Sequence, residues 1–275
     1  MIQIPEIVIE HLKNGARLAI NLSGGKDSQA MARALWEALP EYRHHMFCIH
    51  ADLGRMEWTQ TIDMVKQLAK MLKLPLTIVS RPKGDLLARW QERMELLKGQ
   101  NKPHWSSSAA RYCTSDLKRN PINTYLRNYP YIISCEGIRA IESYNRAKKE
   151  VFSTRTAITT KNRKAFTWYP IFDWSEEQVW ESWGMSSTTL SVLRLTYAAT
   201  GKVHSMWPFH PAYVFGNQRL SCCMCVLGSK KDLANGVKHN PEIAKELAKM
   251  EDVSGFTFRK DISITQLIKE QTNAH

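Results

Sequence analysis

Short apolar runs alternate with helical patterns along the first half of the chain. The apolar runs cover residues 18–22, 45–51, 74–79 and 131–135. Each has the length of a buried strand. Between them apolar residues recur at helical spacing, most clearly over residues 57–72. Strands and helices that alternate in this way predict a parallel sheet with helical crossovers.

Polar caps mark the starts of two further helices. Asp85 precedes one apolar helical pattern, and Ser175 forms a capping-box signature with Gln178 at the start of another. Residues 115–128 also have a helical pattern, in which Pro121 has to be absorbed as a kink or a restart.

The alternation ends near residue 172, and mainly helical patterns follow. We therefore predict an α/β fold in which a parallel twisted sheet is flanked by helices. The predicted domains are a nucleotide-binding α/β domain over residues 1–172 and a smaller, mainly helical C-terminal module over residues 173–275.

The first apolar run leads directly into a polar, glycine-rich turn, Ser23-Gly24-Gly25-Lys26-Asp27-Ser28. The two glycines lack a Cβ, so backbone N–H groups at the start of the next helix can surround a phosphate. Lys26 adds a full charge, and Ser23 and Ser28 add hydroxyl donors. We expect an anion site with Lys26 exposed on the loop. A Gly-Gly turn with polar caps is the alternative reading.

Two other polar turns follow predicted strands. Asp52-Leu53-Gly54 follows the second strand, and Gly137-Ile138-Arg139 follows the fourth. Ligands of open α/β sheets bind at the carboxyl ends of strands, where the Arg139 guanidinium can clamp a phosphate. Asp27 and Asp52 are candidates to hold Mg²⁺ or the nucleotide, and helix capping is the competing role for Asp27.

Composition and net charge indicate which class of partner the chain binds. The chain has 275 residues and a net charge of +12, which favours nucleotide phosphates or a nucleic acid as partner, with a solvated basic surface as the alternative. No apolar run is long enough to span a membrane and no signal-peptide pattern is present, so we expect a cytoplasmic protein without a membrane partner. Six cysteines in such a chain favour metal binding, catalysis or burial over disulfides. Cys48 and Cys135, inside apolar runs, are expected to be buried.

The string of residues 23–28 resembles the pyrophosphate-binding loop of the PP-loop ATP pyrophosphatases, in the adenine nucleotide alpha hydrolase-like superfamily. It also resembles the loop of the phosphoadenosine phosphosulfate (PAPS) reductase family. Further elements of that family follow in order over about residues 17–228: Asp52-Leu53-Gly54, Gly137-Ile138-Arg139 with Ser143 and Arg146, Tyr169-Pro170-Ile171, Asp173-Trp174-Ser175 and Ser221-Cys222-Cys223-Met224-Cys225.

The resemblance implies a site for ATP, PAPS or adenylylsulfate with Mg²⁺. It implies catalytic roles for Lys26, Asp27 and Arg139. The nucleotide-binding residues that it implies are Ser23, Gly24, Gly25, Lys26, Asp27, Ser28, Asp52, Gly54, Gly137, Arg139 and Arg146.

The resemblance also gives the cysteines a role. Cys113 lies where cluster-bearing relatives place a ligand, and Cys222 and Cys225 match a late Cys-x-x-Cys element, with Cys223 as a candidate fourth ligand. An iron–sulfur cluster is therefore expected. A zinc site with a histidine such as His210, or no metal, are the alternatives.

Two motifs resemble the PP-loop sulfurtransferases of DNA phosphorothioation: residues 111–118 and residues 137–143. No cysteine follows Cys225, so the covalent step of thioredoxin-dependent PAPS reductases has no evident nucleophile. The expected function is adenylation of an acceptor for sulfur transfer, with DNA or tRNA and a cysteine desulfurase or other sulfur-donor protein as partners. A PAPS or adenylylsulfate reductase and a non-catalytic nucleotide-sensing or nucleic-acid-binding subunit are the alternatives.

Overall fold

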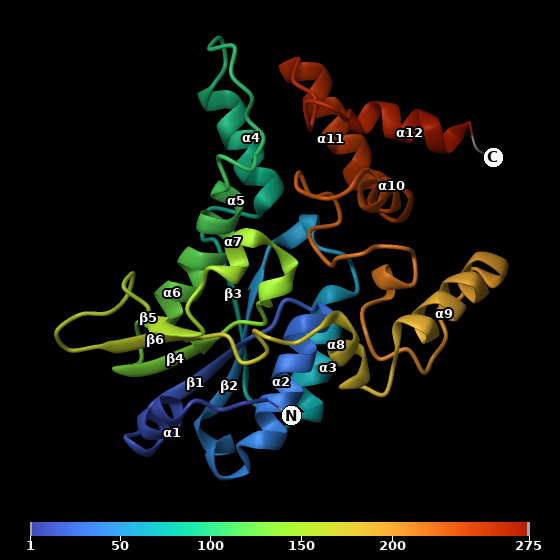
Figure 1. The fold of residues 1–275 in the computed structure, drawn as a ribbon. Coiled ribbons are helices and arrows are strands. Elements are labelled where there is room, and N and C mark those ends of the chain that lie inside the picture. The colour runs from blue at the N-terminus through green and yellow to red at the C-terminus, as the bar shows by residue number, and fades with distance from the viewer. Residues whose placement is uncertain (1, 274–275) are drawn as a thin grey trace. The chain divides into compact units, whose positions relative to one another are not determined.

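The computed structural model describes residues 2–273, which group into two compact units (Figure 1). The first unit contains the residues up to Ala51, Gln60–Val79 and Ile122–Pro211. The second contains Asp52–Thr59, Ser80–Pro121 and the residues from Ala212 onward. Each unit has its own apolar core, so each is described separately.

A six-stranded sheet forms the centre of the first unit, in the order β3-β2-β1-β4-β6-β5. Its strands are β1 (Arg17–Asn21), β2 (Met46–Asp52), β3 (Leu76–Ser80), β4 (Tyr131–Cys135), β5 (Phe152–Thr154) and β6 (Lys164–Trp168). β1 is parallel to both β2 and β4, β4 is parallel to β6, and β5 is antiparallel to β6. The strand order reverses between β1 and β4. In open α/β sheets, the carboxyl ends at such a reversal form the ligand site.

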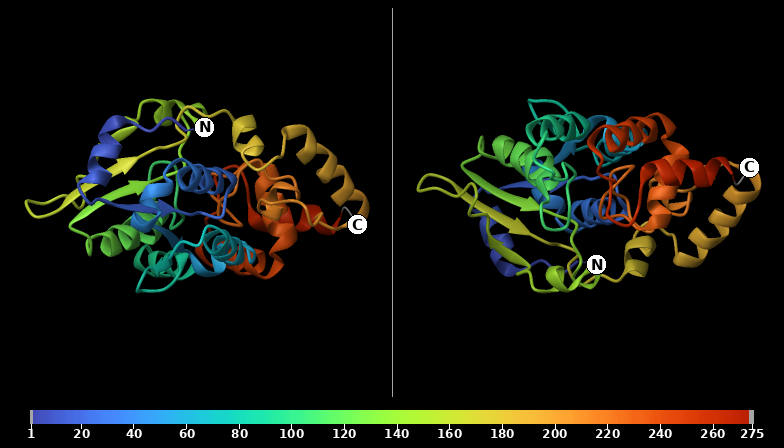
Figure 2. Two further views of the ribbon diagram at one scale, coloured as in Figure 1. Left: turned by 90° about the horizontal axis from the view of Figure 1, so that it is seen from below. Right: turned by 90° about the horizontal axis from the view of Figure 1, so that it is seen from above.

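Helices cover both faces of this sheet. α1 (Glu6–Lys13), α2 (Lys26–Ala38), α3 (Thr61–Met71) and α8 (Glu176–Glu181) contribute to the core on one face, and α6 (Asn120–Leu126) contributes to the core on the other. The first unit also contains α7 (Tyr144–Ala147) and α9 (Ser187–Thr200). Leu18 and Ile20 of β1 pack in a core with Leu12 of α1, whereas Ala19 faces the opposite side and packs with Leu126 of α6. Accordingly, α1 and α6 lie on opposite sides of the sheet (Figure 2).

The second unit is helical. It contains α4 (Leu86–Leu96), α5 (Tyr112–Thr114), α10 (Lys230–His239), α11 (Pro241–Ser254) and α12 (Ile264–Thr272). Trp90, Trp105 and Phe258 pack edge to face in its core, with ring centroids 5.1–5.6 Å apart. The Trp105 indole N–H donates to the Phe256 carbonyl at 2.9 Å. These contacts join residues 80–121 to the C-terminal helices.

Most of the predicted elements are confirmed. The four predicted strands are β1 to β4, Asp85 accepts a hydrogen bond from the Ala88 N–H at 2.9 Å, and Ser175 with Gln178 forms a capping box. β5, β6 and α10 are additional elements. The helix predicted over 115–128 is a π-helical turn, Ser115–Arg119, followed by α6, in which Pro121 lies in the first turn, where its missing N–H costs least.

The compact units do not follow a single cut in the sequence. The first unit continues past residue 172 to Pro211, because Val179 of α8 packs in the same core as the strands. The split at residues 172–173 stays a prediction about which parts of the chain fold alone. Among residues 2–273, no helix has the length and apolar character needed to cross a membrane.

One buried carboxylate organises the end of the second unit. Glu251 of α11 is 6% exposed and accepts hydrogen bonds from the backbone N–H groups of Phe258, Ile264 and Thr265 at 2.6–3.1 Å. The hydroxyls of Ser263 and Thr265 donate to it as well. Glu251 therefore connects α11 to the first turn of α12.

We predict that Glu251→Ala lowers the free energy of unfolding by about 3 kcal/mol, because buried N–H donors lose a charged acceptor. Urea unfolding followed by circular dichroism measures the change. Asp252→Ala, at the exposed neighbouring position, is the matched control and should be nearly neutral. Equal stability of the two variants would show that Glu251 does not hold these elements together.

Candidate functional site

The turn at residues 23–28 connects β1 to α2 and is held by its own polar groups. Gly25 is the N-cap of α2, and Gly24 has a φ of +74°, a conformation that favours glycine. The Ser28 hydroxyl donates to the Gly25 carbonyl at 2.9 Å and accepts from the Ser23 N–H at 3.1 Å. Ser28 thus fixes the shape of the turn, while Ser23 is exposed.

Lys26 is buried, contrary to the exposed position expected from the sequence. It is 3% exposed, and its ammonium lies 3.3 Å from both Asp27 Oδ2 and Glu176 Oε1. It also lies 5.4 Å from the centre of the Trp180 ring. The local sequence does not predict the burial of Lys26, because the residues that cover it come from α8, about 150 positions later in the chain.

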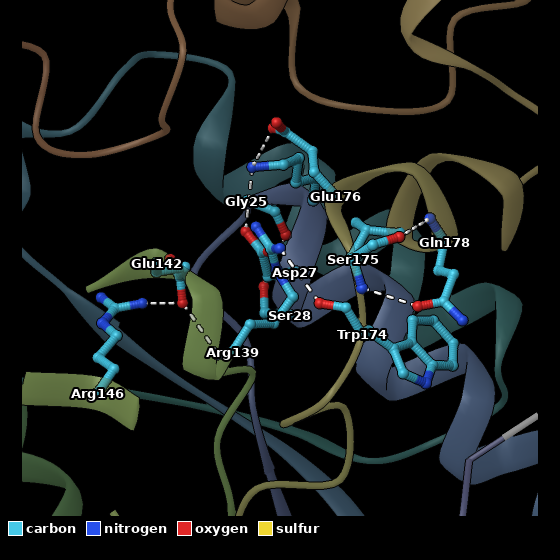
Figure 3. Close-up of polar contacts among 12 residues, drawn as sticks. Gly25, Asp27, Ser28, Arg139, Glu142, Arg146, Trp174, Ser175, Glu176 and Gln178 are labelled. Atoms are coloured by element: carbon cyan, nitrogen blue, oxygen red, sulfur yellow. Dashed lines mark hydrogen bonds and ion pairs between the residues drawn. The ribbon is translucent and has the colours of Figure 1, made fainter. Parts of the chain in front are cut away.

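Asp27 links the lysine to Arg139. Arg139 Nε donates to Asp27 Oδ1 at 2.6 Å, and a second guanidinium nitrogen lies 3.4 Å from the Trp174 carbonyl oxygen (Figure 3). Arg139 is only 4% exposed, so the pairing offsets much of the cost of burying its charge. Both oxygens of Asp27 face cationic groups, which favours a positioning role for this carboxylate over direct Mg²⁺ binding.

Gly137 brings the loop after β4 against the loop after β1. A Cβ at this position would lie 2.9 Å from the carbonyl carbon and oxygen of Asp27 and 3.0 Å from the Ser28 nitrogen. These are backbone atoms of the first turn of α2, so no side-chain motion can make room. The predicted nucleotide-binding residues Gly137 and Arg139 are therefore joined to Lys26, Asp27 and Ser28 in one site.

Glu142 extends this site to Arg146. One of its carboxylate oxygens accepts from the Arg139 backbone N–H at 2.9 Å and also from the Arg146 guanidinium. Glu142, Glu176 and Trp180 were not among the residues that the sequence predicted for the site. The contacts of Glu176 and Trp180 with Lys26 are long-range and leave no local signal, whereas Glu142 lies within four positions of both of its partners.

The charges of this site suit a phosphate ligand. Lys26, Arg139 and the N-terminus of α2 supply positive charge at the strand-order reversal. Of the two carboxylates beside Lys26, Asp27 is also held by Arg139, whereas the Glu176 side chain is 56% exposed. A phosphate can therefore replace Glu176 at the ammonium group without breaking the Asp27–Arg139 pair.

Asp52 and Gly54 lie in the second unit. The Gly54 N–H donates to Asp52 Oδ1 at 2.7 Å, and a Cβ on Gly54, whose φ is +64°, would lie 2.5 Å from the Asp85 Cβ. This glycine therefore allows the turn to pack on the start of α4. A nucleotide-binding role for both residues stays a prediction.

The cysteines divide into two groups. Cys48 and Cys135 are fully buried in the sheet, as expected, and burial raises the pKa of Cys48 to about 12 and that of Cys135 well above its usual range. The thiols of Cys113, Cys222, Cys223 and Cys225 lie in the second unit. Burial raises the pKa of Cys222, and the neighbouring thiols of the other three raise it further, whereas Lys118 lowers it.

These four thiols are the right donors for iron or zinc, because thiolates are preferred ligands of both. Over the described chain, however, no three His, Cys, Asp or Glu side chains are arranged to hold a metal ion. His210, the histidine considered for zinc, is buried in the first unit 3.3 Å from the Thr61 hydroxyl, and burial lowers its pKa to about 4. The thiols therefore match a cluster in chemistry but not in geometry.

Comparison with known proteins identifies the family. Residues 17–199 match the model of the phosphoadenosine phosphosulfate reductase domain. The chain belongs to this family. It is thereby a member of the PP-loop superfamily, and its nucleotide-binding fold follows from that membership.

Several relatives of this PAPS reductase family member match parts of the chain. An uncharacterized protein of Methanocaldococcus jannaschii is 27% identical over 209 residues, 75% of this chain and 41% of that protein. A tRNA(Ile)-lysidine synthase of Symbiobacterium thermophilum is 34% identical over 90 residues, 31% of this chain and 19% of the synthase. The chain thus spans less than half the length of either relative.

A solved structure of phosphoadenylyl-sulfate reductase from Candida auris, in complex with phosphate, also matches this family member. It is 13% identical, with a TM-score of 0.47, and the match covers 79% of this chain and 86% of that one.

We predict that Gly137→Ala weakens nucleotide binding at least tenfold, because the added methyl group displaces the first turn of α2 or the loop after β4. Isothermal titration with ATP and Mg²⁺ measures the affinity, and thermal unfolding monitors the fold. Gly184→Ala is the matched control, since no atom lies within 4 Å of its added Cβ and only the φ of +69° is strained. If Gly137→Ala bound ATP with unchanged affinity, nucleotide binding would not depend on this close approach.

Proposed function

We propose that this chain adenylates an acceptor oxygen at the loop of residues 23–28 so that sulfur can replace that oxygen. The acceptor oxygen attacks the α-phosphorus of ATP, the bond between the α-phosphorus and the bridging oxygen breaks, and pyrophosphate leaves. The outer sulfur of a persulfide on a donor protein, such as a cysteine desulfurase, then attacks the activated acceptor and displaces AMP, which leaves a disulfide between the acceptor and the donor cysteine. A thiol reductant cleaves that disulfide and releases the thiolated acceptor. Phosphorus keeps its oxidation state throughout, and the sulfur atom comes from the donor.

The observation that carries this proposal is the buried Lys26 ammonium beside the glycine turn. In the transition state, negative charge builds up on the leaving pyrophosphate. Lys26 and the backbone N–H groups at the start of α2 are positioned to stabilise that charge. Arg139 holds Asp27 in place and adds a second positive charge within the same site.

A nucleic acid is the proposed acceptor. The net charge of +12 favours a polyanionic partner. The relatives include a tRNA(Ile)-lysidine synthase, which is named for its action on tRNA. DNA and tRNA are the two acceptor classes that the motifs suggest, and they require separate tests.

Two cofactors belong to the proposal. Mg²⁺ bound to the nucleotide phosphates would neutralise charge on the pyrophosphate. Asp27 is already paired with Lys26 and Arg139. Asp52 is the other carboxylate that the sequence motifs suggest as a ligand. An iron–sulfur cluster on Cys113, Cys222 and Cys225, with Cys223 as a candidate fourth ligand, requires these thiols to move into a ligating arrangement. No step above depends on that cluster.

The family match favours a second candidate function, reduction of PAPS or adenylylsulfate to sulfite. This reaction needs two electrons, which Cys222 and Cys225 would supply as a dithiol that becomes a disulfide. Burial raises the pKa of Cys222, so its thiolate is scarce at neutral pH. We therefore rank the reductase below the adenylating enzyme.

Product analysis separates these functions. We expect anaerobically purified protein to release pyrophosphate from ATP and Mg²⁺, with stimulation by DNA or tRNA, and to release AMP by hydrolysis of the adenylate when no sulfur donor is present. Anion-exchange chromatography measures both products. Lys26→Met keeps side-chain volume and removes the charge, so AMP release should fall by about 10²-fold or more while the protein stays folded. Lys70→Met, on the exposed face of α3, should leave the rate unchanged.

Other products would contradict the proposal. Sulfite formed from PAPS or adenylylsulfate with a reductant, without AMP formation from ATP, would identify the reductase. Nucleotide binding without any product would identify a sensing or nucleic-acid-binding subunit.

We predict that Cys222→Ser loses iron and brown colour after anaerobic purification, because one ligand of the proposed cluster is removed. Elemental analysis for iron and zinc gives the readout. Cys48→Ala removes a thiol that is buried in the sheet and should retain the metal. Iron content equal to that of the unmodified protein would exclude Cys222 as a ligand, and zinc in place of iron would indicate the zinc alternative.

A further inference from the structure

An exposed surface of aromatic and basic side chains begins where the nucleotide site ends. We define the α7 platform as Tyr144, Arg146, Lys148 and Lys149. Tyr144 is 75% exposed, and the Lys148 ammonium lies 4.0 Å from the centre of its ring. An aromatic ring that is this exposed keeps a face on which a planar ligand can stack, with a cation beside it.

The platform carries a net positive charge, although Arg146 pairs with Glu142 and Glu150 follows Lys149 in the sequence. Residues 144–149 contain three basic side chains and no acidic one. Lys148 and Lys149 are both exposed. The nearby Arg155 is different, because it is half-buried and pairs with Glu136 at 2.8 Å, so it is not available to a partner.

The platform is fixed to the nucleotide site by two connections. Glu142 accepts hydrogen bonds from the Arg139 backbone and from the Arg146 side chain, and these three residues lie in a row in Figure 3. Lys149 Nζ donates to the hydroxyl of the buried Tyr169 at 3.3 Å. Ser143 caps the single turn of α7 and holds Tyr144 on the outer side.

We propose that the α7 platform binds a single-stranded nucleic acid and presents one of its nucleotides to the loop of residues 23–28. A base stacks on the Tyr144 ring, and the lysine ammonium groups pair with the flanking phosphates. Exposed aromatic rings interleaved with cations are the usual device for holding unpaired strands, because every base has a face to stack and every linkage carries a negative charge. The inference rests on the proposed function for the identity of the acceptor.

An acidic peptide or an anionic membrane fits this surface less well. Lysines alone would satisfy either partner, whereas the exposed Tyr144 ring beside Lys148 gains most from a planar base that stacks on its face. DNA and RNA share this chemistry, so the binding experiment contains one arm for each.

Fluorescence anisotropy of labelled single strands of DNA and RNA, with the full chain, tests the platform. We expect Tyr144→Ala to weaken binding by about tenfold, and Tyr144→Phe to retain it because the stacking face remains. Lys148→Glu with Lys149→Glu should reduce the slope of log affinity against log salt by about 1.4, as two phosphate contacts are lost. The matched control is Lys66→Glu with Lys70→Glu on α3, which makes the same change in net charge at exposed positions and should bind as the unmodified chain does.

The outcomes separate this inference from the proposed function. AMP release from ATP alone, measured on the same variants, should be unchanged, since none of the altered residues contacts the loop of residues 23–28. If the platform variants and the control bind strands equally well, the platform is not the binding surface, and the adenylating function stands. Tighter binding to phosphatidylserine vesicles than to either strand, lost in Tyr144→Ala, would also overturn the inference.

If ATP yields no AMP but strand binding depends on Tyr144, the adenylating function fails and the platform remains. Where binding depends on Tyr144, a preference for DNA or for RNA identifies the strand that the platform binds.

Discussion

The close approach of Gly137 to the backbone of Asp27 and Ser28 is the constraint on which the site depends. It joins the loops that follow β1 and β4, the two strands between which the order of the sheet reverses. A side chain at position 137 would separate these loops, and Arg139 would then no longer reach Asp27. The arrangement of charges therefore follows from a backbone contact that only glycine permits.

Pairing of buried charges is the second organising principle of the site. Lys26 and Arg139 are both almost fully buried, and Asp27 contacts both of them. A buried cation without an anionic partner would be strongly destabilising. A polyphosphate can take the place of the exposed Glu176 in this network, while Asp27 keeps the two cations in position. The two carboxylates beside Lys26 therefore differ: Asp27 is held in place by Arg139, whereas Glu176 is exposed.

The two compact units carry different chemistry. The first contains the glycine turn of residues 23–28, Arg139 and the α7 platform, and the second contains the four thiols at positions 113, 222, 223 and 225. In the second unit, the Cys223 amide donates to the Met56 carbonyl at 2.9 Å, and Gly236 packs so closely on the Cys223 carbonyl that a Cβ would lie 1.9 Å from its oxygen. Family membership covers residues 17–199, so the thiols at positions 222–225 lie outside the matched region.

The sequence by itself determined the parts of the fold that have local causes. The apolar runs predicted β1 to β4, and the capping residues Asp85 and Ser175 predicted the starts of α4 and α8. Each of these signals lies within a few residues of the element that it predicts. The glycine turn, together with the motifs that follow it in order along the chain, predicted the family. Local sequence also suggested Arg139 as a functional residue.

Only the tertiary structure decided which distant residues meet. β5 and β6 are short, and their sequences have no distinctive strand pattern. β6 is stabilised by its pairing with β4, which the sequence around β6 does not indicate. The burial of Lys26 depends on Glu176 and Trp180, and the grouping of residues 80–121 with the C-terminal helices depends on Trp90, Trp105 and Phe258. The contacts of Lys26 with α8, and those of Phe258 with Trp90 and Trp105, join residues more than a hundred positions apart. Their free energy arises from packing and charge pairing in the folded chain, which no local pattern records.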